Sequence, residues 1–406
     1  MQKSFMDIHV IQSVPPSCLN RDDTGSPKTA EYGGVTRSRI SSQCWKRAMR
    51  RYFIENKLFN RDELGIRTKM LVEVISNEIL AIAPDFGEDT AKAVANAGLI
   101  ELGLLPKPSR TKKGGKKIHP STEEDDIGTM DETNESAKAI DQKTLFYISV
   151  KQAKDIATVI VENEKQSKGL NEKKKANSDR LKDLRNALTK TCPVDIALFG
   201  RMLAGDREIS KDASSQVAHA ISTHAVENEF DFFTALDDYR VEHGLSGAAR
   251  HLDTAEFNSA TLYRYATVAL QDLHKNLEPC TPDIFSRAVV AFAKAFIFSR
   301  PDGKQNSFAA NTSPVTVYIA IRNDAPLSFV DAFEKPIRSQ DGHVTPSIQA
   351  FEKRVLDVYS SFYDAPQIAY VLGAPFSQGL GTHCNKDEMF SGLSKLAIDC
   401  ASGVNA

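Results

Sequence analysis

One stretch near the start of the chain, Pro15–Arg51, reads PPSCLNRDDTGSPKTAEYGGVTRSRISSQCWKRAMRR. Its first half is rich in turn-forming residues between Asn20 and Pro27, which predicts a loop and excludes a helix or a central strand there. Its second half predicts a helix that begins near Ser41 or Ser42. Between Tyr32 and Arg51 there are six basic residues and no acidic one, so this helix should have a cationic face.

The basic residues of this helix recur at helical spacing. Lys46 and Arg50 stand one turn apart on one face, as do Arg47 and Arg51 on the next. Serine hydroxyls, the free N–H groups of a helix N-terminus and a row of cations together suit a phosphate backbone. A solvated amphipathic helix with Trp45 in the core accounts for the same charges without any ligand. Clusters of charged residues are more often such solvent-exposed surfaces than binding sites. The helix alone leaves both interpretations open.

The composition is that of an ordinary globular protein. The chain has 406 residues, of which 41% are hydrophobic and 26% charged, and its length suggests two or three domains. The net charge is −2, so any binding of nucleic acid has to come from local basic patches. No apolar run approaches the length of a membrane span, and no signal-peptide pattern is present. The six cysteines are scattered and lack metal-ligand spacing. We therefore expect a cytoplasmic protein with reduced thiols and without a membrane partner, a metal or a cofactor.

Hydrophobic periodicity predicts a series of strands and helices interrupted by a large helical insertion. The expected strands are Phe5–Val14, Val194–Met202, Leu262–Leu270, Val315–Arg322 and Gln367–Leu372. The expected helices after the basic one are Arg61–Ile82, Thr90–Leu104, Asp141–Lys168, Asn177–Lys190, Asp283–Ser299 and Ser347–Tyr363. Without the insertion, the order strand, helix, strand, strand, helix, strand remains, which is the βαββαβ order of ferredoxin-like domains and RNA-recognition modules.

Two other features have structural explanations. His9 lies within the first expected strand, with Ile8 and Val10 on the opposite face, and is expected to be a packed histidine rather than a catalyst. The segment Lys107–Lys117, KPSRTKKGGKK, has six basic residues in eleven, and an acidic counterpart follows at Glu123–Glu132. Its glycine spacing excludes a P-loop, so it is expected to be a solvated surface loop with at most an accessory contact to nucleic acid.

Several motifs, taken together and in order, resemble the signature of the CasC family, the backbone subunit of the type I-E CRISPR surveillance complex, Cascade. They are IHV at Ile8–Val10, PSCLNRDD at Pro16–Asp23, GG at Gly33–Gly34, RISSQ and KRAMR within Arg39–Arg50, VDIAL-GRM at Val194–Met202, AHAI-TH at Ala218–His224, D-FTA-DD at Asp231–Asp238, LYRYA at Leu262–Ala266, PLSFVDAFEK at Pro326–Lys335 and PSIQAF at Pro346–Phe351. The resemblance covers most of the chain. It fails between about Ile54 and Leu188 and again after Tyr370.

The resemblance implies an α+β fold of three parts. The first is a modified RNA-recognition (ferredoxin-like βαββαβ) palm formed by residues 1–59 and 189–406. The second is a helical fingers domain inserted at 60–188, and the third is a thumb β-hairpin at about 226–258 within the palm. It also implies a non-catalytic subunit that binds CRISPR RNA, polymerises head to tail along the guide spacer and presents the guide to a target DNA strand. Its partners would be the CRISPR RNA, the target DNA, further copies of itself and other Cascade subunits.

The candidate site residues form three groups. A phosphate-tracking surface, which in the family holds the guide backbone, would comprise Asn20, Arg21, Lys28, Ser41, Ser42, Gln43, Lys46, Arg47 and Arg50. If about five cations each neutralise one phosphate, the log–log salt slope should be near −3.5 per subunit. Met202, which would usually fill core, takes its place beside the RNA by resemblance, because the GRM motif is intact. Lys304 and Gln305 are weaker candidates for contact with RNA or the next subunit.

The third group is the aromatic run Phe232–Phe233–Thr234. It could simply anchor a hairpin against the core. In the family, however, the equivalent residues wedge into the guide–target duplex, and stacking on an aromatic ring tolerates any base. The family often has tryptophan where this chain has Phe232, which leaves stacking intact.

Two alternative functions remain from the sequence. Asp22 and Asp23 are adjacent carboxylates beside the expected RNA path and could hold a divalent ion for RNA cleavage. Turn formation and pairing with Arg21 explain both aspartates equally well. The chain could also be a protein-interaction scaffold whose basic helix docks an acidic partner. We expect no catalysis.

Overall fold

The computed structural model describes residues 3–106, 145–167, 175–202, 209–244 and 248–402. The chain divides into two compact units, the first containing residues 1–61, 192–202 and 210–406, and the second containing residues 62–191 and 203–209. Both helices and strands contribute to each unit, so the expected α+β class is confirmed. The basic segment Lys107–Lys117 lies outside the described residues.

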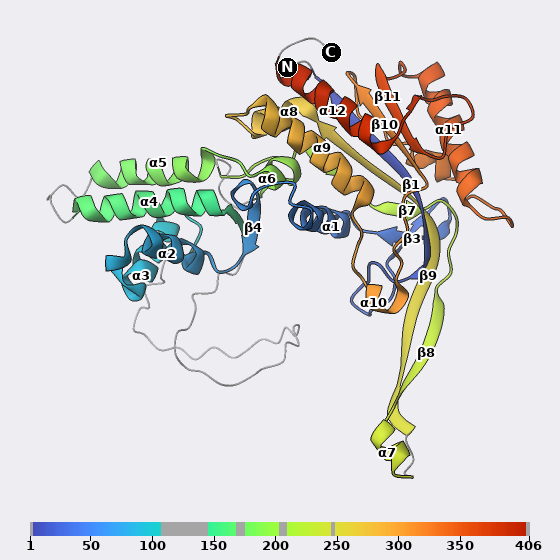
Figure 1. The fold of residues 1–406 in the computed structure, drawn as a ribbon, viewed down its shortest axis with the longest axis horizontal. Coiled ribbons are helices and arrows are strands. Elements are labelled where there is room, and N and C mark those ends of the chain that lie inside the picture. Colours follow the sequence, from blue (N-terminus) through green and yellow to red (C-terminus); the bar gives the residue numbers. More distant parts are fainter. Residues whose placement is uncertain (1–2, 107–144, 168–174, 203–208, 245–247, 403–406) are drawn as a thin grey trace, which may run out of the picture. The chain divides into compact units, whose positions relative to one another are not determined.

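The first unit is built on a ten-stranded sheet with the strand order β12-β11-β10-β1-β9-β7-β3-β2, while β6 and β8 also pair with β9 (Figure 1). Its strands are β1 (Phe5–Ser17), β2 (Thr29–Tyr32), β3 (Val35–Ile40), β6 (Ser215–Val217), β7 (Ala220–Ser222), β8 (Glu229–Leu236), β9 (Ala248–Ala269), β10 (Thr316–Arg322), β11 (Ile368–Gly373) and β12 (Thr382–His383). The central pairs β10·β1, β1·β9 and β9·β7 are all antiparallel. The short outer pair β11·β12 is parallel.

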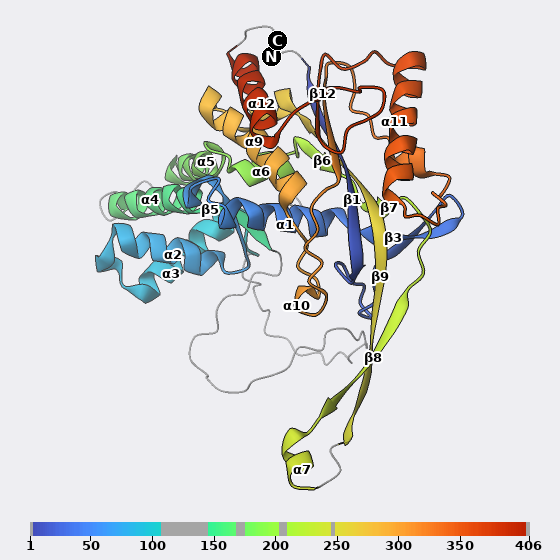
Figure 2. The same ribbon diagram turned by 45° about the vertical axis from the view of Figure 1, so that its right-hand side comes forward.

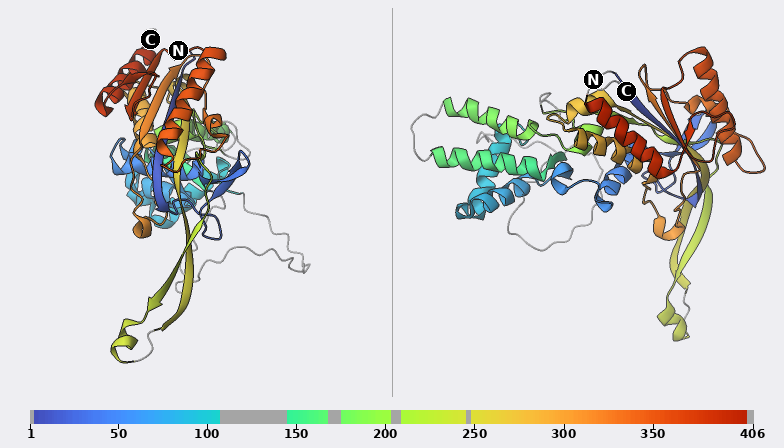
Figure 3. Two further views of the ribbon diagram at one scale, coloured as in Figure 1. Left: turned by 90° about the vertical axis from the view of Figure 1, so that its right-hand side faces the viewer. Right: turned by 45° about the horizontal axis from the view of Figure 1, so that its top comes forward.

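Helices cover both faces of this sheet (Figure 2). On one face lie α1 (Ser42–Glu55), α9 (Pro282–Phe298) and α12 (Lys386–Ala401), the last packed along α9 (Figure 3). On the other face lies α11 (Val344–Ser361) with the short helix η3 (Val330–Phe333). The remaining helices of the unit are α6 (Val194–Phe199), α7 (Asp238–Glu242), α8 (Leu270–Asn276) and α10 (Gln305–Phe308).

Strand β1 is buried on both faces because helices lie on either side of it. Gln12, on the α1 side, accepts a hydrogen bond of 2.7 Å from Arg264. The buried Arg264 guanidinium lies 3.7 Å from the Trp45 ring, which fixes α1 against the sheet. On the α11 side, His9 packs among five aromatic rings, including Tyr263 and Phe351. Burial lowers the pKa of His9 to about 3, so this histidine is neutral, and its prediction as a packed strand residue is confirmed.

The strands β8 and β9 extend beyond the sheet as a long hairpin with α7 at its far end (Figures 1 and 2). A chain of polar side chains ties its base to β3. The Ser38 hydroxyl donates to Asn258 Oδ1 at 2.9 Å, and Asn258 Nδ2 donates to Asn228 Oδ1 at 2.9 Å. Asn228 in turn donates to Glu256 Oε2 at 3.1 Å. Since Ser38 and Asn258 are buried, these bonds fix where the hairpin leaves the sheet.

The second unit is mainly helical around its own core. Its elements are β4 (Gly65–Thr68), α2 (Leu71–Ile82), the short helix η2 (Pro84–Phe86), α3 (Glu88–Glu101), β5 (Phe146–Ser149), α4 (Val150–Ser167) and α5 (Lys175–Thr189). The strands β4 and β5 form a two-stranded antiparallel sheet. Buried side chains of the four helices, such as Ile75, Leu99, Ile160 and Leu184, form the core. A further short helix, η1 (Arg61–Glu63), lies at the boundary of the two units.

Three sequence-based predictions of elements were wrong in whole or at their start, and one of them is the helix predicted at Asp141–Lys168, which begins only at Val150, after strand β5. The run Val194–Met202, predicted as a strand, forms helix α6 as far as Phe199, because all six residues of this helix are buried and its apolar run has no alternation. The helix predicted from Arg61 begins only at Leu71, because Gly65–Thr68 pairs as a strand with Phe146–Ser149. Helix α9, strand β10 and helix α11 match their predicted ranges within a few residues.

Candidate nucleic-acid interface

The turn-rich loop and the start of α1 are joined through Asn20. The Ser41 backbone N–H donates to Asn20 Oδ1 at 2.8 Å, and the Lys28 N–H donates to the Asn20 carbonyl at 2.9 Å. Ser41 is the N-cap of α1, and its hydroxyl accepts a 3.3 Å hydrogen bond from the Cys44 N–H. Asn20 and Ser41 therefore hold the loop against the helix N-terminus. The main role of the buried Ser41 is to cap the helix.

The outward face of α1 carries the predicted polar and cationic residues. Gln43 and Arg47 are exposed, whereas Lys46 is half-buried. Burial, and then the nearby Arg50 charge, lower the pKa of Lys46. Neither Lys46 nor Arg47 forms an ion pair with a carboxylate within the described residues, so both charges are available to an anion. The opposite face buries Trp45 with Met49 and Phe53, as the sequence predicts.

Arg50 has an internal partner that the sequence did not reveal. Its Nε lies 3.4 Å from Oδ2 of Asp195, whose side chain is 2% exposed. The guanidinium also lies 4.6 Å from the centre of the Phe199 ring. Arg50 thus ties α1 to α6, and this structural role accompanies any contact it makes with RNA. The neighbouring Arg51 pairs with Glu55 and Asp302.

The segment around α10 lies directly against the loop. A Cβ on Gly303 would approach the Leu19 carbonyl oxygen to 2.3 Å, so only glycine permits this close packing. Lys304 follows in the left-handed region with φ 46°, a conformation that costs a non-glycine residue about 1 kcal/mol or more. Burial raises the pKa of the Cys18 thiol, and the nearby charges of Lys304 and Arg21 both act against that rise. The structure therefore brings Lys304 to the predicted surface.

Gln305 is held by its own segment. Its Nε2 donates to the Pro301 carbonyl at 3.0 Å, while its buried Oε1 has no hydrogen-bond partner among the described residues. Ser42 donates a long hydrogen bond of 3.4 Å to Gln43 at the start of α1.

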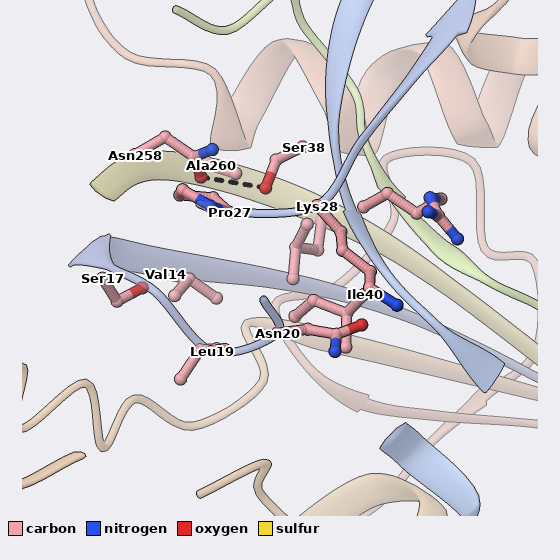
Figure 4. Close-up of a pocket in the computed structure, with 12 residues that line it drawn as sticks. Val14, Ser17, Leu19, Asn20, Pro27, Lys28, Ser38, Ile40, Asn258 and Ala260 are labelled. Atoms are coloured by element: carbon pink, nitrogen blue, oxygen red, sulfur yellow. Dashed lines mark hydrogen bonds between the residues drawn. The ribbon is translucent and has the colours of Figure 1, made fainter. Parts of the chain in front are cut away.

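A second basic group, Arg39 and His219, was not among the predicted site residues and lies beside Lys28. Arg39 Nε donates to the Thr29 carbonyl at 3.0 Å, and Arg39 Nη1 lies 3.3 Å from Nδ1 of the exposed His219. Lys28 and Arg39 line a small pocket together with Asn20 and with Asn258 at the hairpin base (Figure 4). His219 and Lys28 are 191 positions apart in the sequence, so only the β3·β7 pairing, Arg39 with Ile221, reveals this group.

Met202 is 92% exposed, the most exposed of the large hydrophobic side chains that the structure describes. It follows Arg201, which exchanges two backbone hydrogen bonds with Lys211. A methionine that fills core would be buried, so the core interpretation is wrong here, and the position suits a contact with a partner molecule.

The hairpin aromatics are exposed rather than packed on the core. Phe232 is 66% exposed and Phe233 51% exposed, and Thr234 is exposed as well. They lie opposite Thr254, Asp253 and Leu252 of β9, so Phe232 and Phe233 point to opposite faces of the two-stranded ribbon. The hairpin carries them away from α1 (Figures 1 and 3). They therefore form a separate candidate contact on the same unit.

The two adjacent aspartates are accommodated by the loop. Asp22 Oδ1 accepts hydrogen bonds from the Thr24 N–H, the Thr24 hydroxyl and the Ser26 N–H, at 2.8–3.0 Å. The Thr24 hydroxyl contributes most to holding the pKa of Asp22 below its usual value. Asp23 is exposed. Within the described ranges, no three His, Cys, Asp or Glu side chains cluster closely enough to hold a metal ion. Nor does any helix there have the length and apolar character needed to span a bilayer.

A helix face whose Lys46 and Arg47 have no carboxylate partner in the described part of the chain, a second basic group near the sheet edge and an aromatic-bearing hairpin define an α+β protein with an interface suited to a polyanion. Residues 6–393 match the family model Cas_CT1975, described as CT1975-like protein. The chain therefore belongs to this family, and the sequence-based recognition of CasC is confirmed.

Two solved structures are similar over nearly the whole chain. A "CRISPR RNA-guided surveillance complex, pre-nicking" chain is 31% identical with a TM-score of 0.73, and the match covers 97% of this chain and 100% of that one. A "CRISPR RNA-guided surveillance complex" chain is 26% identical with a TM-score of 0.63, with coverages of 96% and 99%. No curated protein matches the chain.

Proposed function

We propose that this chain is the non-catalytic, CRISPR RNA-binding backbone subunit of a type I-E Cascade complex. Copies of it line up head to tail along the guide spacer and present the guide for pairing with a target DNA strand. Two observations support the proposal: nearly full-length similarity to chains of CRISPR RNA-guided surveillance complexes, and a row of cations without carboxylate partners in the described chain. Those cations are Arg21, Lys28, Lys46, Arg47 and Lys304.

These five cations lie on the turn-rich loop, on α1 and just before α10, beside serine and amide groups, and nothing in that set selects a base. Such a surface tracks a phosphate backbone and leaves sequence selection to base pairing. With one phosphate per cation, the log–log salt slope is expected near −3.5 per subunit. Arg50 was predicted to be one of the five phosphate-binding cations, but its charge faces Asp195. Lys304 therefore replaces Arg50 in this set.

We infer that the first unit is an RNA-recognition palm. The antiparallel order β10–β1–β9–β7 follows from a βαββαβ chain in which β1, β7, β9 and β10 are strands one to four and α1 and α9 are the two helices. The β8–β9 hairpin would be the thumb, and the second unit the fingers. Because each copy would use one surface to contact a different surface of the next, the assembly would be an open helix rather than a closed dimer.

The test is to purify the chain with the products of its own operon and to size the nucleic acid that comes with it. Discrete RNA of CRISPR repeat–spacer length, bound by several copies per RNA, is the expected result. A nucleic-acid-free monomer that ignores added guide RNA at low salt would refute the proposal and favour a protein-interaction scaffold.

A metal-dependent ribonuclease is the second candidate, and Asp22 and Asp23 are the only reason to consider it. The Asp22 carboxylate already accepts three hydrogen bonds from its own loop, which disfavours metal binding there. Incubating the RNA complex with Mg²⁺ or Mn²⁺ tests the point. Cleavage that disappears in an Asp22→Asn, Asp23→Asn double variant would establish the nuclease.

A further inference from the structure

The residues Lys28, Arg39 and His219 form a compact basic group next to the surface proposed above. Arg39 and His219 are in contact, with Arg39 Nη1 3.3 Å from His219 Nδ1. Lys28 joins them through the backbone, since the Arg39 N–H donates to the Lys28 carbonyl at 2.8 Å. None of the three forms an ion pair with a carboxylate in the described part of the chain. Three basic side chains together, without a counter-ion, suit an anion.

The hydrogen bond between Arg39 and His219 determines the protonation of the imidazole. A guanidinium has only donors, so Nδ1 of His219 must accept, and the single ring proton lies on Nε2. Placing a second proton on Nδ1 would break this bond and set two cations side by side. Burial, Arg39 and Lys28, in that order, lower the pKa of His219.

An anion between these groups reverses that balance. A phosphate oxygen accepts from Arg39 and from a protonated His219 together, and it offsets the charge of Lys28 as well. The charged groups that lower the pKa of the imidazole are Arg39 on β3 and Lys28 on the loop, both cationic. No carboxylate is among them, so the bound anion itself must supply the negative charge.

The group lies where an extended polyanion would continue. Arg39 is two residues before Ser41, the N-cap of α1. Lys28 follows the turn-rich loop, which Asn20 connects to Ser41 by a hydrogen bond. On the other side, Lys28 and Arg39 share their pocket with Asn258 at the base of the hairpin (Figure 4). A strand of RNA that leaves the α1 surface toward the hairpin would therefore pass this group.

We propose that Arg39 and His219, with Lys28, hold one backbone phosphate of the bound RNA, and that His219 takes up a proton as the phosphate binds. This inference rests on the proposed RNA-binding function and adds to it a proton-coupled contact. RNA affinity should consequently rise as the pH falls from 7.5 to 6. The gain should be about fivefold, the difference between a charge-assisted and a neutral hydrogen bond.

The experiment measures binding of a fluorescent, 5′-hydroxyl single-stranded RNA to the full chain at fixed salt and at both pH values. His219→Gln keeps an N–H donor but cannot become charged, so it should bind like the wild type at pH 7.5 and lose the gain at pH 6. His383→Gln is the matched control, because His383 is also exposed but lies on β12, at the opposite end of the sheet from β2 and β3. It should keep the full pH dependence.

Each other outcome has a definite meaning. An equal pH response in His219→Gln and the wild type, or no response in the wild type, overturns this inference and leaves RNA binding intact. Absence of RNA binding at both pH values overturns the proposed function itself. Independently, Arg39→Gln should lower the magnitude of the salt slope by about 0.7. An unchanged slope would remove Arg39 from the phosphate contact.

Discussion

The clearest test of the α1 surface compares two cations that are one turn apart, Lys46 and Arg50. In sequence they look equivalent, and both were predicted to bind the guide backbone. In the structure Lys46 has no carboxylate partner within the described residues, whereas Arg50 pairs with the buried Asp195. Lys46→Ala should therefore weaken RNA binding, whereas the main effect of Arg50→Ala should be a lower free energy of unfolding.

The magnitudes differ enough to separate the two variants. Truncating one partner of a buried ion pair costs about 3–5 kcal/mol, because the other charge stays buried. Since the Arg50 side chain is 22% exposed and therefore partly screened, we expect about 2–3 kcal/mol for Arg50→Ala. Lys46→Ala should change stability by less than about 0.5 kcal/mol and lower the magnitude of the salt slope by about 0.7.

The chain provides its own probe for this measurement. Trp45 is the single tryptophan, is 2% exposed and lies on α1 itself, so its fluorescence during urea unfolding reports on this unit. Arg51→Ala is the matched control, because Arg51 is an exposed arginine on the same helix whose surface ion pairs should contribute about 0–1 kcal/mol. Salt titrations of RNA binding complete the comparison.

One pattern of results would refute the reasoning. If Arg50→Ala unfolds at the same urea concentration as the wild type and loses as much salt slope as Lys46→Ala, then the contact with Asp195 contributes nothing and Arg50 is simply a phosphate ligand.

Three further predictions concern the hairpin, the buried strand β1 and a tight turn. Phe233→Ala should leave guide RNA affinity within about twofold and weaken target DNA binding by about 1–3 kcal/mol, and an equal loss in both binding assays would contradict a duplex-wedge role. Burial raises the pKa of Asp7 to about 6, so its contribution to stability falls as pH rises from about 4 to 6. Asp7→Asn should therefore gain about 2–3 kcal/mol relative to wild type over that window in urea unfolding, and a constant difference would be contrary evidence. Gly33→Ala would bring a Cβ to 1.8 Å from the Glu334 carbonyl oxygen, whereas the space around Gly25 is open. Gly33→Ala should therefore lower the free energy of unfolding clearly more than Gly25→Ala. Equal losses would show that the backbone relaxes around the new Cβ.

The elements that the sequence predicted well are those whose pattern is local. Helix α1 begins where Ser41 provides a cap, and α9 and α11 show apolar residues at helical spacing. Strand β9 was predicted only from Leu262, although it begins at Ala248. The residues Asp253–Phe257 in its hairpin half are exposed or half-buried and show no regular apolar alternation, so pairing with β8, rather than hydrophobic pattern, makes them a strand.

The sequence predicted which residue types form the candidate site, but not which residues of the chain they contact. The sequence shows how many arginines lie near α1, yet it cannot show that Arg37 is buried and donates to the carbonyls of Tyr32, Ser222 and Phe333. These partners are up to 296 positions away. The same distance in sequence hid the contact between Arg39 and His219.

Strand β9 belongs to two structures at once. Its first part, Ala248–Phe257, pairs with β8 in the hairpin, and the rest, Asn258–Ala269, pairs with β1 at the centre of the sheet. An insertion or deletion of one residue in the hairpin half of β9 would thus shift its pairing with β8 by one position and turn the β9 side chains beyond it to the opposite face of the ribbon. The hairpin can therefore change its length without loss of register only by equal insertions or deletions in β8 and β9.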